Sequence, residues 1–448
     1  MKIKFAILVI LLGFITSCER FLEEKPDINM VVPESPEDLR ALLDISQYMN
    51  ISPQVLEISS DDYYLDASDW NALASPTDRN LYIWNEEVYK EARSDGAWMN
   101  CYVQVYYANV VIHTIESGNM LQTEKAEAEN LLGAAFFYRA KAFFEIAQIW
   151  ANPYDRESSE NLLGIPLRLS PDFNVVSTRS TLRQTYEQIL SDLTNAIELL
   201  RYDPSEHVNR PNQCAAFAML ARVYLTMGEF KLAAEMAEKA LALKSVLLDY
   251  NDLDKTAQLP FKRFNEEVIF NSYMTSSTPI MRAKIDSMLY KSYEVFDLRK
   301  DLFFNRLPSG GYGFKGNYYE DNAIFFNGLT TAELYVICAE AYMVMGHLSR
   351  SSDFLNQLLL KRYVQSEFSP YDGSEPNYEN IVLGERRKEL VFRGLRWSDV
   401  RRYNTLGRDI LMERNIDGER FFLRKGSPRF TVPIPESVIS ISGIQQNP

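Results

Sequence analysis

The sequence is poor in the residue types that build disulfide frameworks, metal sites and catalytic centres. Its 448 residues include four cysteines and three histidines. Beyond Cys18, the cysteines Cys101, Cys214 and Cys338 are widely spaced and give neither a disulfide framework nor a CxxC metal pattern. Each stands in an apolar helical context, where a free cysteine behaves as a small hydrophobe, so we expect all three in the core. The histidines belong to no spaced metal or triad pattern. We expect no metal and no cofactor.

Positive charge and long apolar runs are also scarce. The chain carries 47 Lys and Arg against 61 Asp and Glu, a net charge of −14. This charge argues against nucleic-acid binding and against attraction to anionic lipid head groups. The one marked apolar run covers residues 5–15, behind Lys2 and Lys4. It fits the hydrophobic part of a secretion signal and is too short to span a bilayer, and no later run is long enough.

The end of the apolar run predicts a lipid anchor. Ile15, Thr16 and Ser17 lead directly to Cys18, and this quartet resembles the lipobox of bacterial lipoproteins, whose cysteine receives a diacylglycerol. The alternative is an ordinary signal peptide that happens to contain a cysteine. Small residues before Cys18 and polar residues after it favour the lipoprotein. We therefore expect residues 1–17 to be the signal peptide and Cys18 to hold the mature chain at a membrane.

Hydrophobic periodicity predicts helices over most of the chain. Residues 133–150 are apolar on almost every side, which is typical of a helix buried between other helices. Residues 181–200 instead carry one apolar stripe in steps of three and four, as an amphipathic helix does. Residues 98–118 and 124–150 together predict a degenerate helix pair.

Two later segments, which begin at Ala221 and Ala339, repeat one another. The matched positions are Ala221/Ala339, Tyr224/Tyr342, Met227/Met345, Gly228/Gly346 and Leu241/Leu359. Small alanines, a space-filling tyrosine and a turn glycine are typical of tetratricopeptide-like helical hairpins. Such hairpins need neighbours to bury their faces. The sequence predicts a mainly α fold: a tetratricopeptide-like helical bundle interrupted by long irregular loop insertions.

Two irregular regions, residues 50–85 and 296–328, are rich in aromatic side chains. The second has four glycines within residues 310–316, too dense for a regular helix, and it is interpreted as a long loop with room for a short hairpin. Long loops in compact domains are commonly functional. Tyr and Trp offer a broad apolar face and a polar tip, which suits sugar binding. The candidate ligand-binding residues are Trp70, Trp84, Tyr312, Tyr318 and Tyr319. For each of them, burial in the core is the alternative.

Several segments, in order along the chain, resemble the SusD/RagB family of outer-membrane lipoproteins. The strongest match covers residues 385–404, ERRKELVFRGLRWSDVRRYN. The other matching segments are residues 21–26, 98–111, 138–144, 164–167, 433–436 and 446–448. The resemblance implies a SusD-like helical region over residues 18–260. It implies a SusD/RagB region with the aromatic-rich loop over residues 261–448.

The charges of residues 385–404 permit two interpretations. One is an active site of carboxylates and arginines, and the other is a structural clamp whose ion pairs join two lobes. Core residues are interleaved with the charges, which favours the clamp. Paired carboxylates elsewhere, such as Asp61 and Asp62, are expected by chance in so acidic a chain.

The resemblance also implies a function. Members of the family bind glycans or other nutrients outside the cell and pass them to a TonB-dependent outer-membrane transporter of the SusC type. We therefore expect a lipid-anchored outer-membrane protein that faces the cell exterior and is not an enzyme. The alternatives are a tetratricopeptide-type scaffold lipoprotein for protein assembly and, with less support, a glycoside hydrolase.

Overall fold

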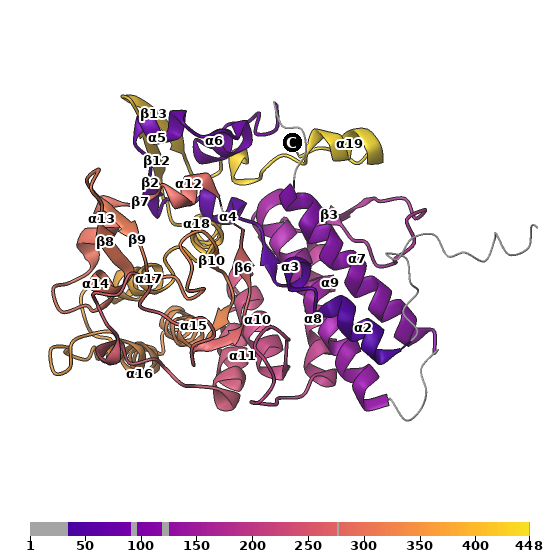
Figure 1. Ribbon diagram of the computed structural model, residues 1–448, viewed down its shortest axis with the longest axis horizontal. Coiled ribbons are helices and arrows are strands. Elements are labelled where there is room, and N and C mark those ends of the chain that lie inside the picture. The colour runs from indigo at the N-terminus through magenta and orange to yellow at the C-terminus, as the bar shows by residue number, and fades with distance from the viewer. Residues whose placement is uncertain (1–34, 91–95, 119–124, 276, 448) are drawn as a thin grey trace, which may run out of the picture.

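The computed structural model describes residues 35–90, 96–118, 125–275 and 277–447. Helices dominate these ranges, which confirms the mainly α fold class (Figure 1). Within them, no helix combines the length and the apolar character needed to cross a membrane. The predicted signal peptide and the predicted anchor Cys18 lie outside the described residues.

Three long helices form one end of the molecule. They are α7 (Gly96–Glu116), α8 (Lys125–Trp150) and α9 (Leu182–Leu199). Helix α8 packs against both of the others, and every residue from 133 to 150 is buried, as its all-round apolar pattern predicts. The predicted helix pair is confirmed. Helix α9 begins with a capping box, in which Thr181 and Gln184 each accept the other's backbone N–H.

The sequence repeat corresponds to two helical hairpins. The first joins α10 (Gln213–Thr226) to α11 (Phe230–Leu243), and the second joins α15 (Thr331–Val344) to α16 (Leu348–Leu359). Gly228 and Gly346 turn the chain with φ of +75° and +78°, a conformation that favours glycine. Helices α11 and α15 pack together, so the two copies are neighbours. The predicted hairpins are confirmed.

Two further helices, α17 (Tyr378–Glu389) and α18 (Arg396–Thr405), follow the second hairpin in the chain. The connection between them turns at Gly394, where φ is +69°. A Cβ atom there would lie 2.7 Å from Asn327 Nδ2 and 2.9 Å from Met274 Sδ, so a side chain would not fit. The Gly394 N–H donates to Glu57 Oε2 at 2.8 Å. The turn of the family-like segment therefore packs directly on the first irregular region.

Short helices and strands occupy the rest of the described chain. The helices are α2 (Pro36–Leu43), α3 (Ser46–Met49), α4 (Val55–Ile58), α5 (Ala67–Asn71), α6 (Pro76–Tyr82), α12 (Thr278–Met281), α13 (Ser287–Ser292), α14 (Arg299–Phe303), α19 (Glu436–Ser442) and the 3-10 turns η3 (Tyr250–Asp252) and η4 (Pro428–Phe430). The strands are β1 (Ile51–Ser52), β2 (Tyr63–Tyr64), β3 (Leu163–Pro166), β4 (Arg179–Thr181), β5 (Val268–Phe270), β6 (Tyr273–Met274), β7 (Lys284–Ile285), β8 (Phe304–Arg306), β9 (Tyr312–Phe314), β10 (Phe325–Phe326), β11 (Leu329–Thr330), β12 (Met412–Ile416) and β13 (Glu419–Leu423).

These strands form small sheets instead of one large one. The three-stranded sheet has the order β1-β6-β10, and the others are pairs, among them β2-β7, β8-β9 and β12-β13. The second irregular region, predicted as a long loop with room for a short hairpin, contains the antiparallel hairpin β8-β9, which pairs Phe304 with Phe314.

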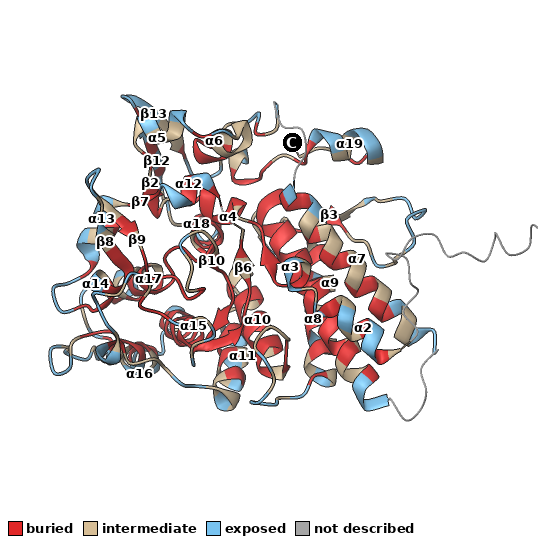
Figure 2. Ribbon diagram, in the orientation of Figure 1, coloured by how far each residue is buried: buried red, intermediate tan, exposed pale blue. Residues whose placement is uncertain are grey.

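One hydrophobic cluster extends from Leu39 to Ile444 and draws on both predicted regions of the chain. Buried residues line the facing sides of the helices, while α19 has no buried residue and is largely exposed (Figure 2). Cys101, Cys214 and Cys338 are all buried, as expected from their apolar surroundings.

Candidate functional site

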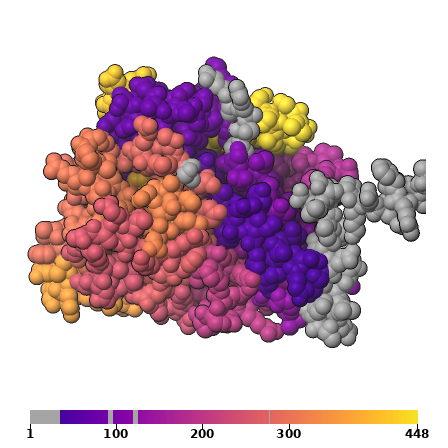
Figure 3. Space-filling view, in the orientation of Figure 1, coloured from indigo at the N-terminus to yellow at the C-terminus, as the bar shows by residue number. Residues whose placement is uncertain are grey.

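The structure brings the two irregular regions together at one edge of the molecule. Strand β2 pairs antiparallel with β7, with Tyr63 opposite Ile285 and Tyr64 opposite Lys284. Strand β7 also packs against β9 of the hairpin (Figure 1). The hairpin turn lies so close that a Cβ atom on Gly311 would be 2.9 Å from Tyr64 Oη. In the space-filling view, the purple surface of the N-terminal part at the top of the molecule borders the orange surface near residue 300 (Figure 3).

A lysine fixes these regions to one another. The side chain of Lys284 is 3% exposed and forms an ion pair with Asp66 of the first region. The same ammonium donates to the backbone carbonyl of Ser309, in the hairpin turn, at 3.3 Å. A buried ammonium needs such partners, because an unpaired charge is costly inside a protein. Lys284 therefore holds the surface in one arrangement.

Between these segments and the β12-β13 hairpin lies a polar depression, which we call the charged hollow. Its volume is about 420 Å³, within the usual range for small-ligand sites. The lining residues are Asp61, Tyr63, Tyr64, Asp286, Leu411, Glu413, Arg414, Asn415 and Arg387. They offer carboxylate acceptors, guanidinium and amide donors and a phenol, a set that matches a ligand rich in hydroxyl groups.

Ion pairs set the protonation of the acids at the hollow. Burial alone would raise the pKa of Asp61, but Arg387 and Arg396 outweigh it and hold the pKa well below the usual range. Arg396 Nε donates to Asp61 Oδ1 at 2.6 Å. Beneath them, burial and the neighbouring charge of Asp62 raise the pKa of Glu57 to about 8. Asp61 is therefore an ionised hydrogen-bond acceptor and not a proton donor.

Glu57 lies deeper than the hollow and is completely buried. Its two carboxyl oxygens accept hydrogen bonds from the Gly394 backbone and from the Ser60 hydroxyl. In the described parts of the chain, no three His, Cys, Asp or Glu side chains group in a way that would hold a metal ion.

Two of the predicted aromatic residues have partly exposed rings. Tyr312 stacks on Tyr290 with ring centroids 3.7 Å apart and planes inclined by 16°. Trp70, in α5, is half-buried, and its indole N–H donates to the Arg79 carbonyl at 3.4 Å. Neighbouring Asp69 pairs with Arg282 at 2.9 Å, which ties α5 to the segment before β7. Tyr312 and Trp70 remain candidates for stacking on a ligand.

The other predicted aromatic residues are buried. Trp84 is 3% exposed and donates to the Ser59 carbonyl, and Tyr318 is 1% exposed. Tyr319 is 9% exposed and lies under the Arg263 guanidinium, apart from the hollow. Trp84 and Tyr318 therefore do not line the charged hollow, and the polar tips of both rings have partners inside the fold.

Several residues of the hollow were missed by sequence reasoning. Asp61 was attributed to chance, and Arg387 was assigned to the clamp alone. Tyr64 is not among the predicted ligand-binding residues, and Asp286 belongs to neither irregular region. The doublet of acids directly before two tyrosines, at residues 61–64, was the available signal.

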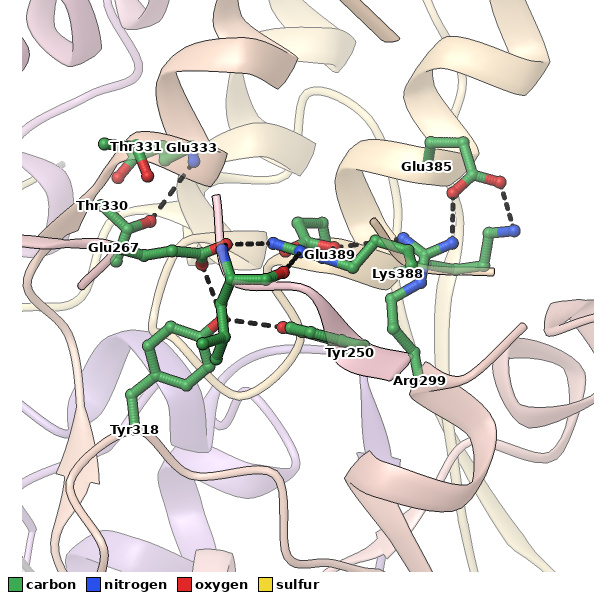
Figure 4. Close-up of polar contacts among 12 residues, drawn as sticks. Tyr250, Glu267, Arg299, Tyr318, Thr330, Thr331, Glu333, Glu385, Lys388 and Glu389 are labelled. Carbon is green, nitrogen blue, oxygen red and sulfur yellow. Dashed lines mark hydrogen bonds and ion pairs between the residues drawn. The ribbon is translucent and has the colours of Figure 1, made fainter. Parts of the chain in front are cut away.

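The charges of residues 385–404 form the predicted clamp. Arg299, from α14, pairs with Asp297, Glu385 and Glu389, and all four side chains are almost wholly buried. Figure 4 shows Arg299 among Glu385, Glu389 and Lys388. This network joins α17 to the segment around residue 300.

A second arginine extends the network. Arg362 donates to both Glu267 and Glu389, at 2.7 and 2.9 Å. Glu267 also accepts a hydrogen bond from the Tyr318 hydroxyl at 2.7 Å. The hydroxyl groups of Tyr250 and Tyr318 are hydrogen-bonded to each other at 2.7 Å (Figure 4). Tyr318 is therefore part of the clamp.

The comparisons with known proteins agree with this architecture. Residues 20–225 match a family described as starch-binding and associating with the outer membrane, and residues 327–448 match the SusD family. The chain is 22% identical over 417 residues to SusD-like protein P2 of Formosa agariphila, covering 78% of this chain and 79% of that protein.

Solved structures show the same fold. A SusD superfamily protein of Bacteroides thetaiotaomicron superposes with a TM-score of 0.75 at 21% identity, over 92% of this chain and all of that one. A SusD-like carbohydrate-binding protein of Bacteroides vulgatus gives a TM-score of 0.68 at 14% identity, over 91% of this chain and 97% of that one.

Proposed function

The chain belongs to the SusD family, and from this we propose that it is a lipoprotein of the outer membrane that binds a glycan or another nutrient at the cell exterior. We further propose that it delivers this ligand to a TonB-dependent transporter of the SusC type. The observation that carries the binding role is the charged hollow, with the partly exposed Tyr312 on the hairpin beside it.

The hollow suits a sugar for chemical reasons. Each sugar hydroxyl both donates and accepts, so it needs acceptors such as Asp61 and Asp286 and donors such as Arg387 and Asn415. Charge-assisted hydrogen bonds to these groups are stronger than neutral ones. The flat ring of Tyr312 offers a surface for the C–H face of a sugar. This combination supports a binding protein over a scaffold.

We propose that the ligand is bound without being changed. Hydrolysis of a glycoside needs one carboxylic acid that gives a proton and one carboxylate that acts as base or nucleophile. Asp61 is held ionised by two arginines, and Glu57 carries a raised pKa but is sealed below the hollow. This arrangement supports a binding protein over a hydrolase.

Replacing Tyr312 with alanine is expected to weaken glycan binding by about 1–3 kcal/mol, by analogy with the stacking of bases on aromatic rings. The helical fold stays intact because the ring is only partly buried. Calorimetry of the purified protein against a panel of polysaccharides, with chromatography for released products, measures both binding and turnover.

The matched control is Tyr106→Ala, which removes another partly buried tyrosine, stacked on Phe173 of the distant β3–β4 connection. Equal losses in the two variants would contradict a site at Tyr312. Released products would favour the hydrolase, and no binding to any glycan would favour another nutrient or the scaffold.

We propose that the outer faces of the tetratricopeptide-like hairpins dock onto the transporter. Lys231 and Glu235 project from α11 with side chains 81% and 46% exposed. Affinity purification after mild detergent extraction should recover a large barrel protein in near-equal amount. Reversing both charges should lower that recovery without changing the melting temperature, whereas Lys425→Glu, on the exposed turn after β13, should not. Recovery of the lipoprotein alone in several mild detergents would argue against docking.

A further inference from the structure

The end of the molecule formed by α7, α8 and α9 carries an apolar groove, which we call the α7–α19 groove. It lies between α7, the connection from β3 to β4, and α19, and it shares no lining residue with the charged hollow. Its volume is about 280 Å³, just below the usual range of about 300–1,000 Å³ for small-ligand sites. Apolar side chains make up most of its wall, among them Trp98, Tyr102, Tyr106, Phe173, Val438 and Ile444. A groove of this size and character suits the side chains of a peptide segment.

Large apolar side chains at the groove remain in contact with solvent. Phe173 is 72% exposed, although its ring stacks on Tyr106 with centroids 5.0 Å apart. Val176, on the same connection, and Ile441, on α19, are 78% and 89% exposed. Exposed apolar side chains that gather at one place commonly mark a contact with another segment or molecule. A peptide segment in the groove would cover the free face of Phe173.

Two arginines give this place a positive charge. Arg168 lines the groove and donates to the Asp172 carbonyl at 2.6 Å. Arg179 donates to the carbonyl of Gln445, next to Ile444 of the groove wall, at 3.1 Å. Within the described part of the chain, neither guanidinium forms an ion pair with a carboxylate. The groove therefore favours a segment that is apolar and also acidic.

The segment that precedes the described chain has this character. Its residues 21–24 read Phe-Leu-Glu-Glu, two large apolar side chains followed by two carboxylates, and residues 19–34 contain five acidic and two basic residues. The described chain begins at Ser35, the N-cap of α2, and α2 packs on α7. The 12 residues between Leu22 and Ser35 can span up to about 45 Å when extended. Since the 21 residues of α7 extend over only about 30 Å, the segment is long enough to reach the groove.

We propose that residues 21–24 dock in the α7–α19 groove of their own chain. The two apolar side chains pack against the aromatic wall, and the two carboxylates pair with Arg168 and Arg179. A second copy of the chain would bring its whole net charge of −14 to the contact and would be repelled. The tethered segment instead binds at the high effective concentration that a short linker gives.

Docking determines how far the folded body can move from a membrane, given the proposed attachment through Cys18. With residues 21–24 docked, only Glu19 and Arg20 separate Cys18 from the body, a tether of about 10 Å. Without docking, the tether runs from Cys18 to Ser35 and reaches about 60 Å. The docked segment therefore holds the α7–α19 end of the protein close to the bilayer.

Disulfide trapping tests the docked position. The mature chain, residues 18–448, carries Cys18→Ser, so that its other native thiols are the three buried ones. Leu22→Cys and Ser442→Cys, the second in the groove wall, are then added. Mild oxidation should join them within one chain, because a disulfide needs Cβ atoms about 3.5–4.5 Å apart. The matched control is Asp27→Cys with the same Ser442→Cys. It moves the thiol five residues along the segment and should give a much lower yield.

Proteolysis without added cysteines tests the groove itself. A glutamate-specific protease cuts after Glu23 and Glu24 only while the segment is undocked, so the rate follows the undocked population. Phe173→Ala removes a largely exposed ring of the groove and should speed this cleavage about 3- to 10-fold without changing the melting temperature. Phe296→Ala, which removes a ring that is 43% exposed outside the groove, should leave the rate unchanged.

Three results would overturn the proposal. The first is equal disulfide yield from Leu22→Cys and Asp27→Cys, or no disulfide from either, which means that the segment has no fixed place in the groove. The second is a disulfide between two molecules on a non-reducing gel, which means that the occupant comes from a second copy. The third is unchanged cleavage in Phe173→Ala. Neither experiment contains a ligand, a lipid or a transporter, so the outcome is independent of the proposed function.

Discussion

Replacing Arg362 with alanine should destabilise the fold by about 3–5 kcal/mol, the usual result of removing one partner from a buried ion pair. Arg362 has no exposed surface, and it donates to Glu267, Glu389 and the Leu248 carbonyl. Its loss removes the cation that is paired with the buried Glu267 and leaves the buried Glu389 with Arg299 alone. Since domains are stable by only about 5–15 kcal/mol, this is a large fraction of the total. Denaturant unfolding followed by circular dichroism measures it.

The matched control is Arg420→Ala, which breaks a surface ion pair with Glu413 whose side chains are 57% and 36% exposed. Such pairs contribute at most about 1 kcal/mol. Equal effects of the two variants would show that the Arg362 network does not hold the fold.

The same network predicts that the fold loses stability at acidic pH. Burial would raise the pKa of Glu389, but Arg362 and Arg299 outweigh it and lower the pKa in the folded protein. Because the pKa of Glu389 is lower in the folded protein than in the unfolded chain, its ionised carboxylate stabilises the fold fully above the unfolded pKa of about 4.3. This contribution to the free energy of unfolding is lost as the pH falls through the lower, folded pKa.

Replacing Cys18 with alanine should release the protein from the membrane and abolish metabolic labelling with palmitate. The reason is chemical: without the thiol there is no position for the diacylglycerol, and the net charge of −14 gives no attraction to an anionic membrane. Cell fractionation and labelling measure both effects.

The matched control is Cys338→Ala, which removes a fully buried thiol from α15 and should leave labelling unchanged. Unchanged labelling of Cys18→Ala would rule out this cysteine as the attachment site.

Most of the long helices could be predicted from the sequence, because the patterns that indicate them are local. The apolar residues of α8 occur on every side, and the turn glycines Gly228 and Gly346 stand at matched places in the repeat. The clamp could be predicted for a related reason, since its charges alternate with apolar residues over residues 385–404. A helix buries side chains at intervals that are visible in one window of sequence.

The residues that line the charged hollow could not be predicted in the same way. Trp70 and Trp84 both occur in the same irregular region, but Trp84 is covered by segments remote in sequence, including Arg414, which lies 5.1 Å from its ring. Likewise Tyr64 contributes to the hollow because β7, far along the chain, aligns with it. Exposure of an aromatic ring depends on such distant neighbours, and no local pattern contains them.

The bond between Lys284 and Asp66 joins positions 218 residues apart in the sequence. Contacts of such long range form late, because a long loop must close before they contribute any stability. A chain that crosses a membrane from its N-terminus would therefore expose α7, α8 and α9 first. At that stage β2 of the first irregular region could not yet pair with β7. The charged hollow would be among the last parts of the protein to acquire its shape, and a truncated chain that ends before β7 would lack it.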